Sequence, residues 1–265
     1  MRRVIHELTR SSIRALLVEG QAARPRVRRV MLEPLDGPPS AETLQRLLEP
    51  FQPAKSELIN VISREQTLTR TLTLPSTQRD ELDSMIRLAA KAQLPYPPEQ
   101  AALDWMLIAS QEGSSLVQLV ACLREWVERH VGLLRQAGLR PDVLTPSSWG
   151  VAAWYQRFGA SPLVQEPAMV VHIDAERTDL VLMRQGRVVF SRNLNQGAGE
   201  WSASLEPLLQ DIERSLTSVR KELPGMEAAS VVCTGIGLLE AWRAAMEQRV
   251  GLPVVVRQGY GDLAL

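Results

Sequence analysis

Two short loops in this 265-residue chain carry polar side chains whose types and spacing could do chemistry. The first loop follows Val4-Ile5-His6 and reads Glu7-Leu8-Thr9-Arg10-Ser11-Ser12. The second follows Val170-Val171 and reads His172-Ile173-Asp174-Ala175-Glu176-Arg177-Thr178. Each lies between two apolar runs, which predicts a strand, a tight loop and a second strand. Loops of this kind often bind phosphate, and a unit that occurs twice indicates two related half-domains.

Other catalytic arrangements have no support in the sequence. The two cysteines, Cys122 and Cys233, are far apart and form no CxxC pair, which excludes a cysteine zinc site and favours buried thiols in a reducing compartment. His130 has no serine or cysteine nucleophile in register, so a hydrolase triad is not indicated. The segment 197–199, Gly-Ala-Gly, lacks the βαβ surroundings of a dinucleotide fingerprint and is predicted to be a flexible loop.

The composition is that of a soluble globular protein, with 45% hydrophobic residues and a formal net charge of zero. This balance gives no indication of a nucleic-acid partner. Arg24, Arg26, Arg28 and Arg29 form a local basic cluster, interpreted as a solvated strand edge, with an acidic partner or anionic lipid as the alternative. Neither a signal peptide nor a run of about 20 apolar residues is present, so we expect a cytosolic or peripheral chain.

Strands and helices alternate as expected of an α/β protein with mixed sheets. Before the linker at 159–167, we expect strands at 3–20, 27–32, 57–62 and 68–74, and a helix capped by Ser40. The segment 76–138 reads as helix, strand, strand, helix, beginning at the N-cap Ser76 and ending at Gly138. After the linker, we expect the second hairpin, helices at 202–222 and 238–249, and strands at 230–233 and 254–257.

Several motifs in this order resemble the PilM family of type IV pilus assembly, within the actin-like ATPase superfamily. The most specific are Leu72-Thr73-Leu74-Pro75, Gln93-Leu94-Pro95-Tyr96-Pro97 and Leu103-Asp104-Trp105. The resemblance spans nearly the whole chain, with weaker matches at 138–141, 212–216 and 251–254. It implies an α/β, actin-like ATPase (ribonuclease H-like) two-domain fold with an FtsA-type inserted subdomain. The implied units are 1–75 with 139–163, 76–138, and 164–265.

The resemblance also implies positions in a nucleotide cleft. Glu7 falls at the aspartate of the first phosphate loop and Thr9 at its glycine, with Ser11 and Ser12 after them. In the second loop His172 falls at the aspartate, Asp174 at the glycine and Thr178 at the threonine. Gly235 and Gly237 stand in the adenosine loop.

The chemistry of these positions departs from what a bound nucleotide needs. Glycine allows backbone N–H groups to approach phosphate oxygens, whereas Thr9 and Asp174 obstruct them and Asp174 adds negative charge. His172 does not suit a magnesium shell. We therefore expect a degenerate cleft with no catalytic residue, no cofactor, and weakened or lost binding of ATP and Mg²⁺.

Two other interpretations of the loop residues stay open. They could simply solvate two surface loops. If the loops face each other, His6, Glu7, His172 and Asp174 could approach one another and bind Zn²⁺, although strand alternation favours turning His6 away from Glu7. We predict that no metal is bound.

The function implied by the resemblance is recognition rather than turnover. Such a protein is a cytoplasmic scaffold, peripheral to the inner membrane, that holds the N-terminal cytoplasmic tail of a single-pass, PilN-like pilus assembly protein and contacts the motor ATPase. The tail would lie in a groove between the first domain and the insertion. Candidate groove residues, with core packing as the alternative, are Leu72, Leu74, Leu82, Met85, Ile86 and Tyr96.

The alternatives are an active actin-like ATPase or kinase relative with divergent loops, a filament-forming actin-like protein, and a platform component of type II secretion. Self-association is a further expectation that the sequence leaves open.

Overall fold

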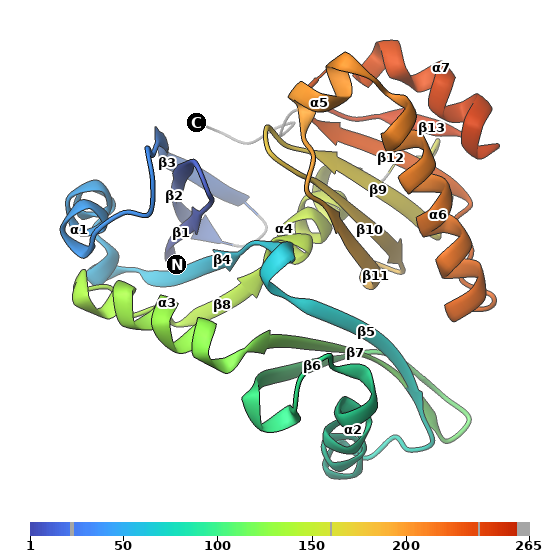
Figure 1. Ribbon diagram of the computed structural model, residues 1–265, viewed down its shortest axis with the longest axis horizontal. Coiled ribbons are helices and arrows are strands. Elements are labelled where there is room, and N and C mark those ends of the chain that lie inside the picture. The colour runs from blue at the N-terminus through green and yellow to red at the C-terminus, as the bar shows by residue number, and fades with distance from the viewer. Residues whose placement is uncertain (22–23, 160, 238, 259–265) are drawn as a thin grey trace.

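The two predicted hairpins open two five-stranded sheets of the same topology, in a computed structural model that describes residues 1–21, 24–159, 161–237 and 239–258. The strand order is β3-β2-β1-β4-β8 in the first sheet and β11-β10-β9-β12-β13 in the second. A third sheet, with the order β5-β7-β6, lies below the other two in the view of Figure 1, and its strands β5 and β6 contact β11 of the second sheet. The repeated sequence unit therefore corresponds to a repeated fold unit.

The first sheet combines an antiparallel meander with two parallel strands. Its strands are β1 (Arg2–Leu8), β2 (Ser12–Gln21), β3 (Arg24–Pro34), β4 (Glu57–Ile62) and β8 (Val143–Pro146). Helices α1 (Ala41–Leu48) and α3 (Arg124–Gln136) cover one face, where Val4 and Ile13 pack against Leu44 and Leu134. Ser40 caps α1 as predicted, accepting the Thr43 N–H at 3.1 Å. Short 3₁₀ turns cover Glu49–Phe51 and Pro53–Lys55.

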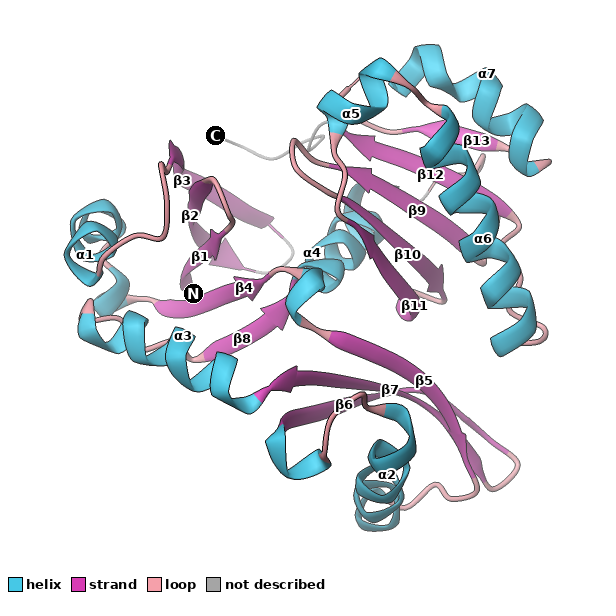
Figure 2. Ribbon diagram, in the orientation of Figure 1, coloured by secondary structure: helices cyan, strands magenta, loops and turns pink. Residues whose placement is uncertain are grey.

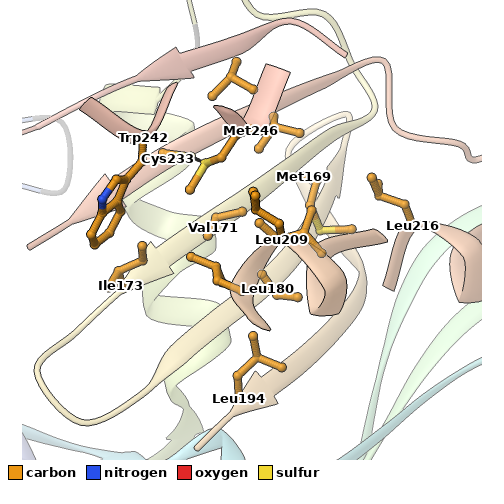
Figure 3. Close-up of a cluster of buried hydrophobic side chains, with 14 of the residues drawn as sticks. Met169, Val171, Ile173, Leu180, Leu194, Leu209, Leu216, Cys233, Trp242 and Met246 are labelled. Carbon is orange, nitrogen blue, oxygen red and sulfur yellow. Dashed lines mark hydrogen bonds between the residues drawn. The ribbon is translucent and has the colours of Figure 1, made fainter. Parts of the chain in front are cut away.

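The second sheet carries the largest core of the described residues. Its strands are β9 (Ala168–Ile173), β10 (Thr178–Arg184), β11 (Arg187–Leu194), β12 (Ser230–Gly235) and β13 (Val254–Val256). Helices α5 (Ala198–Ala203), α6 (Glu206–Glu222) and α7 (Leu239–Val250) lie over one face (Figure 2). Met169 and Val171 of β9 face Leu209 of α6 and Met246 of α7 in this core (Figure 3). Helix α4 (Ser147–Trp154), followed by a π turn at Tyr155–Gly159, packs on the opposite face.

The third sheet consists of β5 (Leu68–Leu74), β6 (Ala101–Gln111) and β7 (Ser114–Leu123). Helix α2 (Arg79–Gln93) covers one face, and a 3₁₀ turn at Pro98–Gln100 leads into β6. A further 3₁₀ turn at Arg64–Gln66 connects β4 of the first sheet to β5.

The packing of two elements does not match the boundaries predicted for the inserted subdomain, 76–138. Residues 68–74, which the sequence analysis assigns to the first domain, form β5 and pair with β7 of the third sheet. Helix α3, assigned to the insertion, instead packs on the first sheet through Leu134. The alternation of residues 68–74 predicts a strand but does not specify which sheet it joins. We therefore propose that the inserted unit runs from residue 68 to residue 123.

Three smaller predictions are corrected. Helix α2 begins at Arg79 rather than at Ser76, whose hydroxyl accepts the Gln78 N–H at 3.0 Å ahead of the helix. The single helix predicted at 202–222 is divided into α5 and α6, and residues 198–199 begin α5 instead of forming a loop. Residue 238, where the last helix is predicted to begin, lies outside the described residues. Among the helices that the structure describes, none has the length and apolar character needed to cross a membrane.

Candidate functional site between the two five-stranded sheets

The two predicted phosphate loops meet in a cleft between the first and second sheets. A cavity of about 490 Å³ lies there, lined from the first sheet by Glu7 and Arg14 and from the second by His172, Asp174 and Gly235. Helix α4 contributes Val151 and Trp154 to the same cavity. The structure thus brings together in one cavity the three segments that the resemblance assigns to a nucleotide cleft.

Four charged side chains cross this cleft and pair with one another. Arg14 of β2 donates to both carboxylate oxygens of Asp174, one of them through Nη2 at 3.0 Å. Arg177 donates to the Glu7 carboxylate, and Arg14 Nη1 lies 3.7 Å from the other Glu7 oxygen. We call Glu7, Arg14, Asp174 and Arg177 the cleft ion network. Each hairpin supplies one arginine and one carboxylate, so the network joins the two halves of the chain.

Pairing offsets the cost of burying these charges. Burial disfavours the charged form of Asp174, but the hydrogen bonds and charge of Arg14 outweigh it and hold the pKa of Asp174 below its ordinary value. Burial raises the pKa of Glu7, although Arg177 and Arg14 oppose that shift. For Arg177, burial acts downward, yet Glu7 and Asp179 raise its pKa above the ordinary value. Arg177 therefore occupies the cleft as a cation.

The first loop uses its own side chain to satisfy the N–H groups that a phosphate would need. The Thr9 hydroxyl accepts from the backbone N–H of Ser12 at 3.0 Å and of Ser11 at 3.3 Å. It also lies 2.9 Å from the Ser12 hydroxyl. The Ser11 hydroxyl donates to Glu176 of the second loop. Thr9, which the resemblance places at the glycine position, thus accepts from N–H groups that a glycine would leave available.

The second loop is closed in the same way. The Asp174 carboxylate accepts the Ala175 N–H at 2.7 Å in addition to the guanidinium of Arg14. Thr178 is fully buried, where its hydroxyl donates to the Gln196 carbonyl at 3.0 Å and accepts from the Trp201 indole at 2.8 Å. Thr178 is therefore a structural residue in this chain.

In the loop that follows β12, the backbone conformation requires glycine at position 235. Gly235 has a φ of +108°, and a Cβ there would lie 1.9 Å from the Ile173 carbonyl oxygen. The next residue, Ile236, donates its N–H to that same oxygen at 2.9 Å. Gly237 adopts a φ of +106°, beside Trp242. The close approach of β12 to β9 accounts for Gly235 without a bound nucleotide.

Both histidines of the metal hypothesis line the cleft cavity, but the side chain of His6 contacts Asn60 instead of His172. His172, the last residue but one of β9, pairs with Asp179 of β10. Burial lowers the pKa of its imidazole, although Asp179 and Asp174 act in the opposite direction. His6 lies on the side of the first sheet that faces α3: its Nδ1 is 3.3 Å from Asn60 Nδ2, and Asn60 Oδ1 is 2.7 Å from Nε2 of His130. Within the described ranges, no group of three or more His, Cys, Asp or Glu is placed to hold a metal ion.

Sequence reasoning identified neither arginine of the network. The alternation of side chains along 12–16 does predict that Arg14 lies on the face opposite to Ile13 and Ala15. It does not reveal the partner, because Asp174 is 160 positions away in sequence.

A second polar cluster joins all three sheets at Arg64, which follows β4. Its guanidinium donates to Ser191 Oγ at 2.9 Å and to the Ser191 carbonyl at 2.8 Å on β11. It also donates to Thr69 Oγ1 of β5 at 2.7 Å and to the Thr67 carbonyl. Burial lowers the pKa of Arg64 to about 10, against the favourable charge of Asp179. These hydrogen bonds hold the segment that leads from β4 of the first sheet into β5 of the third, and they hold β5 against β11 of the second.

The predicted groove residues divide into two sets. Leu74, Leu82 and Ile86 are buried in the core between α2 and the third sheet, with Leu72 and Met85 partly buried against it. For Leu74, Leu82 and Ile86 the structure therefore favours core packing, which the sequence left open as the alternative to a groove wall. Tyr96 is half-buried after α2, and burial raises its pKa. Tyr96, Leu72 and Met85 retain surface that a partner could contact.

Comparison with known proteins agrees with this architecture. The family model described as "Type IV pilus assembly protein PilM" matches residues 39–207, more than half of the chain. The structure of a PilM-PilN type IV pilus biogenesis complex is similar over 97% of this chain and 88% of that chain, with a TM-score of 0.77 and 20% identity.

Two further solved structures share the fold at lower identity. The cytoplasmic domain of EpsL, an inner-membrane component of the type II secretion system of Vibrio cholerae, has a TM-score of 0.57 and 10% identity, covering 89% of this chain and 83% of that one. A Bacteroides thetaiotaomicron protein with an actin-like ATPase fold has a TM-score of 0.56 and 9% identity, covering 96% and 90%. The chain has the actin-like ATPase fold and belongs to the PilM family of type IV pilus assembly proteins.

Proposed function

We propose that this chain is a non-catalytic scaffold of a type IV pilus assembly platform. The proposal that the chain does not catalyse a reaction rests on the cleft ion network. It places two guanidinium groups and two carboxylates where the loops would have to receive phosphates and Mg²⁺. Binding a nucleotide there requires breaking part-buried ion pairs and bringing phosphate charge beside Glu7 and Asp174.

The proposed partner is the N-terminal cytoplasmic tail of a PilN-like, single-pass inner-membrane protein. Family membership and the similarity to a PilM structure solved with PilN support this choice. The tail would bind between the first sheet and the third sheet. Edge strand β8 borders this region with Val143, which is 39% exposed, and an extended peptide can pair with such an edge.

This partner would hold the chain at the cytoplasmic face of the inner membrane, where we also propose contact with the motor ATPase. The similarity to EpsL supports one alternative setting, a platform of type II secretion. Whether the chain binds the tail of a pilus protein or of a secretion protein will identify the machine to which it belongs.

The test is binding of the full chain to the tail of the membrane protein encoded beside it, measured by fluorescence anisotropy. Saturable binding of the pilus-type tail, without nucleotide, is the expected result. An absence of binding at tens of micromolar contradicts the scaffold assignment, and preferential binding of a secretion-type tail assigns the chain to the other machine.

A further inference from the structure

The third sheet has β6 as an edge strand, because its strand order is β5-β7-β6. With eleven residues, β6 is about twice as long as a typical strand. Unpaired N–H and C=O groups along such an edge can pair with a strand of another molecule. If the chain associates with itself through the third sheet, β6 therefore offers the longest run of backbone groups for it.

Alternate residues of β6 direct their backbone groups away from β7. In an antiparallel pair, residues that bond to the neighbouring strand alternate with residues whose N–H and C=O face outward. The pairing with β7 is regular from Ala101 to Leu107, and it shifts only between Leu107 and Ala109. The backbone groups at positions 101, 103, 105 and 107 therefore share one orientation.

Two charged side chains bond to backbone groups of this set. Arg124, the first residue of α3, donates from Nη2 to the Ala101 carbonyl at 2.7 Å. The Asp104 carboxylate accepts the N–H of Trp105 at 2.8 Å. A guanidinium and a carboxylate of this chain thus take the places that the backbone of another strand would take.

A third charged side chain comes from the second sheet. Arg187 of β11 donates to the Leu107 carbonyl at 3.1 Å. The third sheet in turn closes the edge of β11, where the Thr71 hydroxyl donates to the Val189 carbonyl at 2.5 Å. The two sheets thus bond to each other's edge strands. We call Asp104, Arg124 and Arg187 the edge caps.

The edge caps oppose the pairing of β6 with another strand. All three side chains are exposed, and each makes a hydrogen bond in which one partner is ionised. An incoming strand would have to displace these bonds and replace them with bonds between neutral backbone groups, which are weaker. Charged side chains along an edge are also a recognised protection against edge-to-edge association.

We propose that the edge caps close the outer edge of the third sheet, and that their removal lets β6 pair with the β6 strand of a second copy of this chain. The edge caps come from three elements, α3, β6 and β11, so the closure depends on how the third sheet is seated in the fold. This inference does not depend on the function proposed above.

The test compares the full chain with the variant Asp104→Ala/Arg124→Ala/Arg187→Ala by sedimentation velocity from about 1 to 100 micromolar. The double variant Asp104→Ala/Arg187→Ala, which leaves α3 unchanged, is measured beside it in case the triple variant folds poorly. Melting temperatures establish that each variant is folded. Hydrogen exchange of the segment 101–111 reports whether β6 is the strand that becomes paired.

A matched control removes the same charges from a helix surface. Glu125, Arg129 and Arg135 are exposed on α3, so Glu125→Ala/Arg129→Ala/Arg135→Ala also deletes one carboxylate and two guanidinium groups. A labelled peptide with the sequence of residues 101–111 provides a second reading, because its binding to the edge is measured by anisotropy and needs no self-association.

The expected result is self-association of the cap-free variants at least about tenfold stronger than that of the wild type, with slower exchange at 101–111 and saturable binding of the peptide. The wild type and the control should show neither change. Sedimentation like that of the wild type in folded cap-free variants overturns the proposal. So does equal peptide binding by the wild type, or association that leaves exchange at 101–111 unaltered.

Discussion

Arg14 of the first hairpin holds both carboxylate oxygens of Asp174 in the second. The resemblance to nucleotide-binding relatives implies a glycine at the position of Asp174, and the Asp174 carboxylate also accepts the loop N–H of Ala175. One side chain therefore both accepts a loop N–H group and binds a cation from the opposite sheet. The two halves of the chain are joined by protein charges at the place where a nucleotide would bridge them.

The pair should contribute measurable coupling to stability. A double-mutant cycle of Arg14→Ala and Asp174→Ala, followed by urea unfolding, is expected to give about 1–3 kcal/mol, because both groups are part-buried and the contact is bidentate. The exposed pair Arg129–Glu125 on α3 is the matched control and is expected to give about 0.5 kcal/mol or less. Equal coupling in the two cycles would show that the cleft ion network does not join the halves.

Arg64 should be necessary for the junction of the three sheets. Arg64→Ala is expected to lower the free energy of unfolding by about 3 kcal/mol, since it leaves buried acceptors on Ser191 and Thr69 without their donor. Arg64→Lys should recover little of this, because an ammonium cannot reproduce the planar fork. Arg70→Ala, which removes an exposed guanidinium bonded to the Thr69 carbonyl, is the control and should cost about 0.5 kcal/mol or less. A similar loss in the Arg64 and Arg70 variants contradicts this role.

His6 should make the fold sensitive to acid. Burial, aided by the nearby His130, lowers the pKa of His6 to about 4 from 6.5. Between these values the unfolded chain binds a proton that the folded chain does not, so stability is complete above pH 6.5 and falls as the pH drops toward 4. The full effect is about 3 kcal/mol.

The His6→Gln variant separates this contribution from other titrations. Its free energy of unfolding should fall less steeply than that of the wild type over the same pH range. A constant difference between the two proteins at every pH contradicts the prediction. His130, whose pKa burial also lowers, remains in both proteins.

Tyr96 should affect partner binding without affecting the fold. Tyr96→Ala is expected to weaken binding of the PilN-like tail about tenfold or more, since a half-buried aromatic side chain beside the proposed groove offers a large contact area. Leu88→Ala, on an exposed part of α2, should leave the affinity unchanged. Anisotropy titrations with matched melting temperatures check this, and equal affinities in the two variants would remove Tyr96 from the proposed site.

The sequence predicts the repeated hairpins because each alternates apolar residues around a polar loop, and local pattern is sufficient for that. It also places Thr9 and Asp174 at glycine positions once the resemblance is recognised. It cannot predict that Arg14 reaches Asp174, because that contact depends on how two distant sheets close together. Nor does an apolar helix face reveal its neighbour: Leu82 and Ile86 fit a groove wall equally well, yet they fill the core beneath α2.

Calorimetric titration of the wild-type chain with Mg-ATP tests the central claim most directly. Thr9 accepts from the N–H groups of its loop, and Arg14 and Arg177 are paired with Asp174 and Glu7. We therefore expect no saturable heat up to about 1 mM nucleotide. Saturable binding, together with ATP turnover that Glu7→Ala abolishes, would contradict it and identify the chain as an active ATPase.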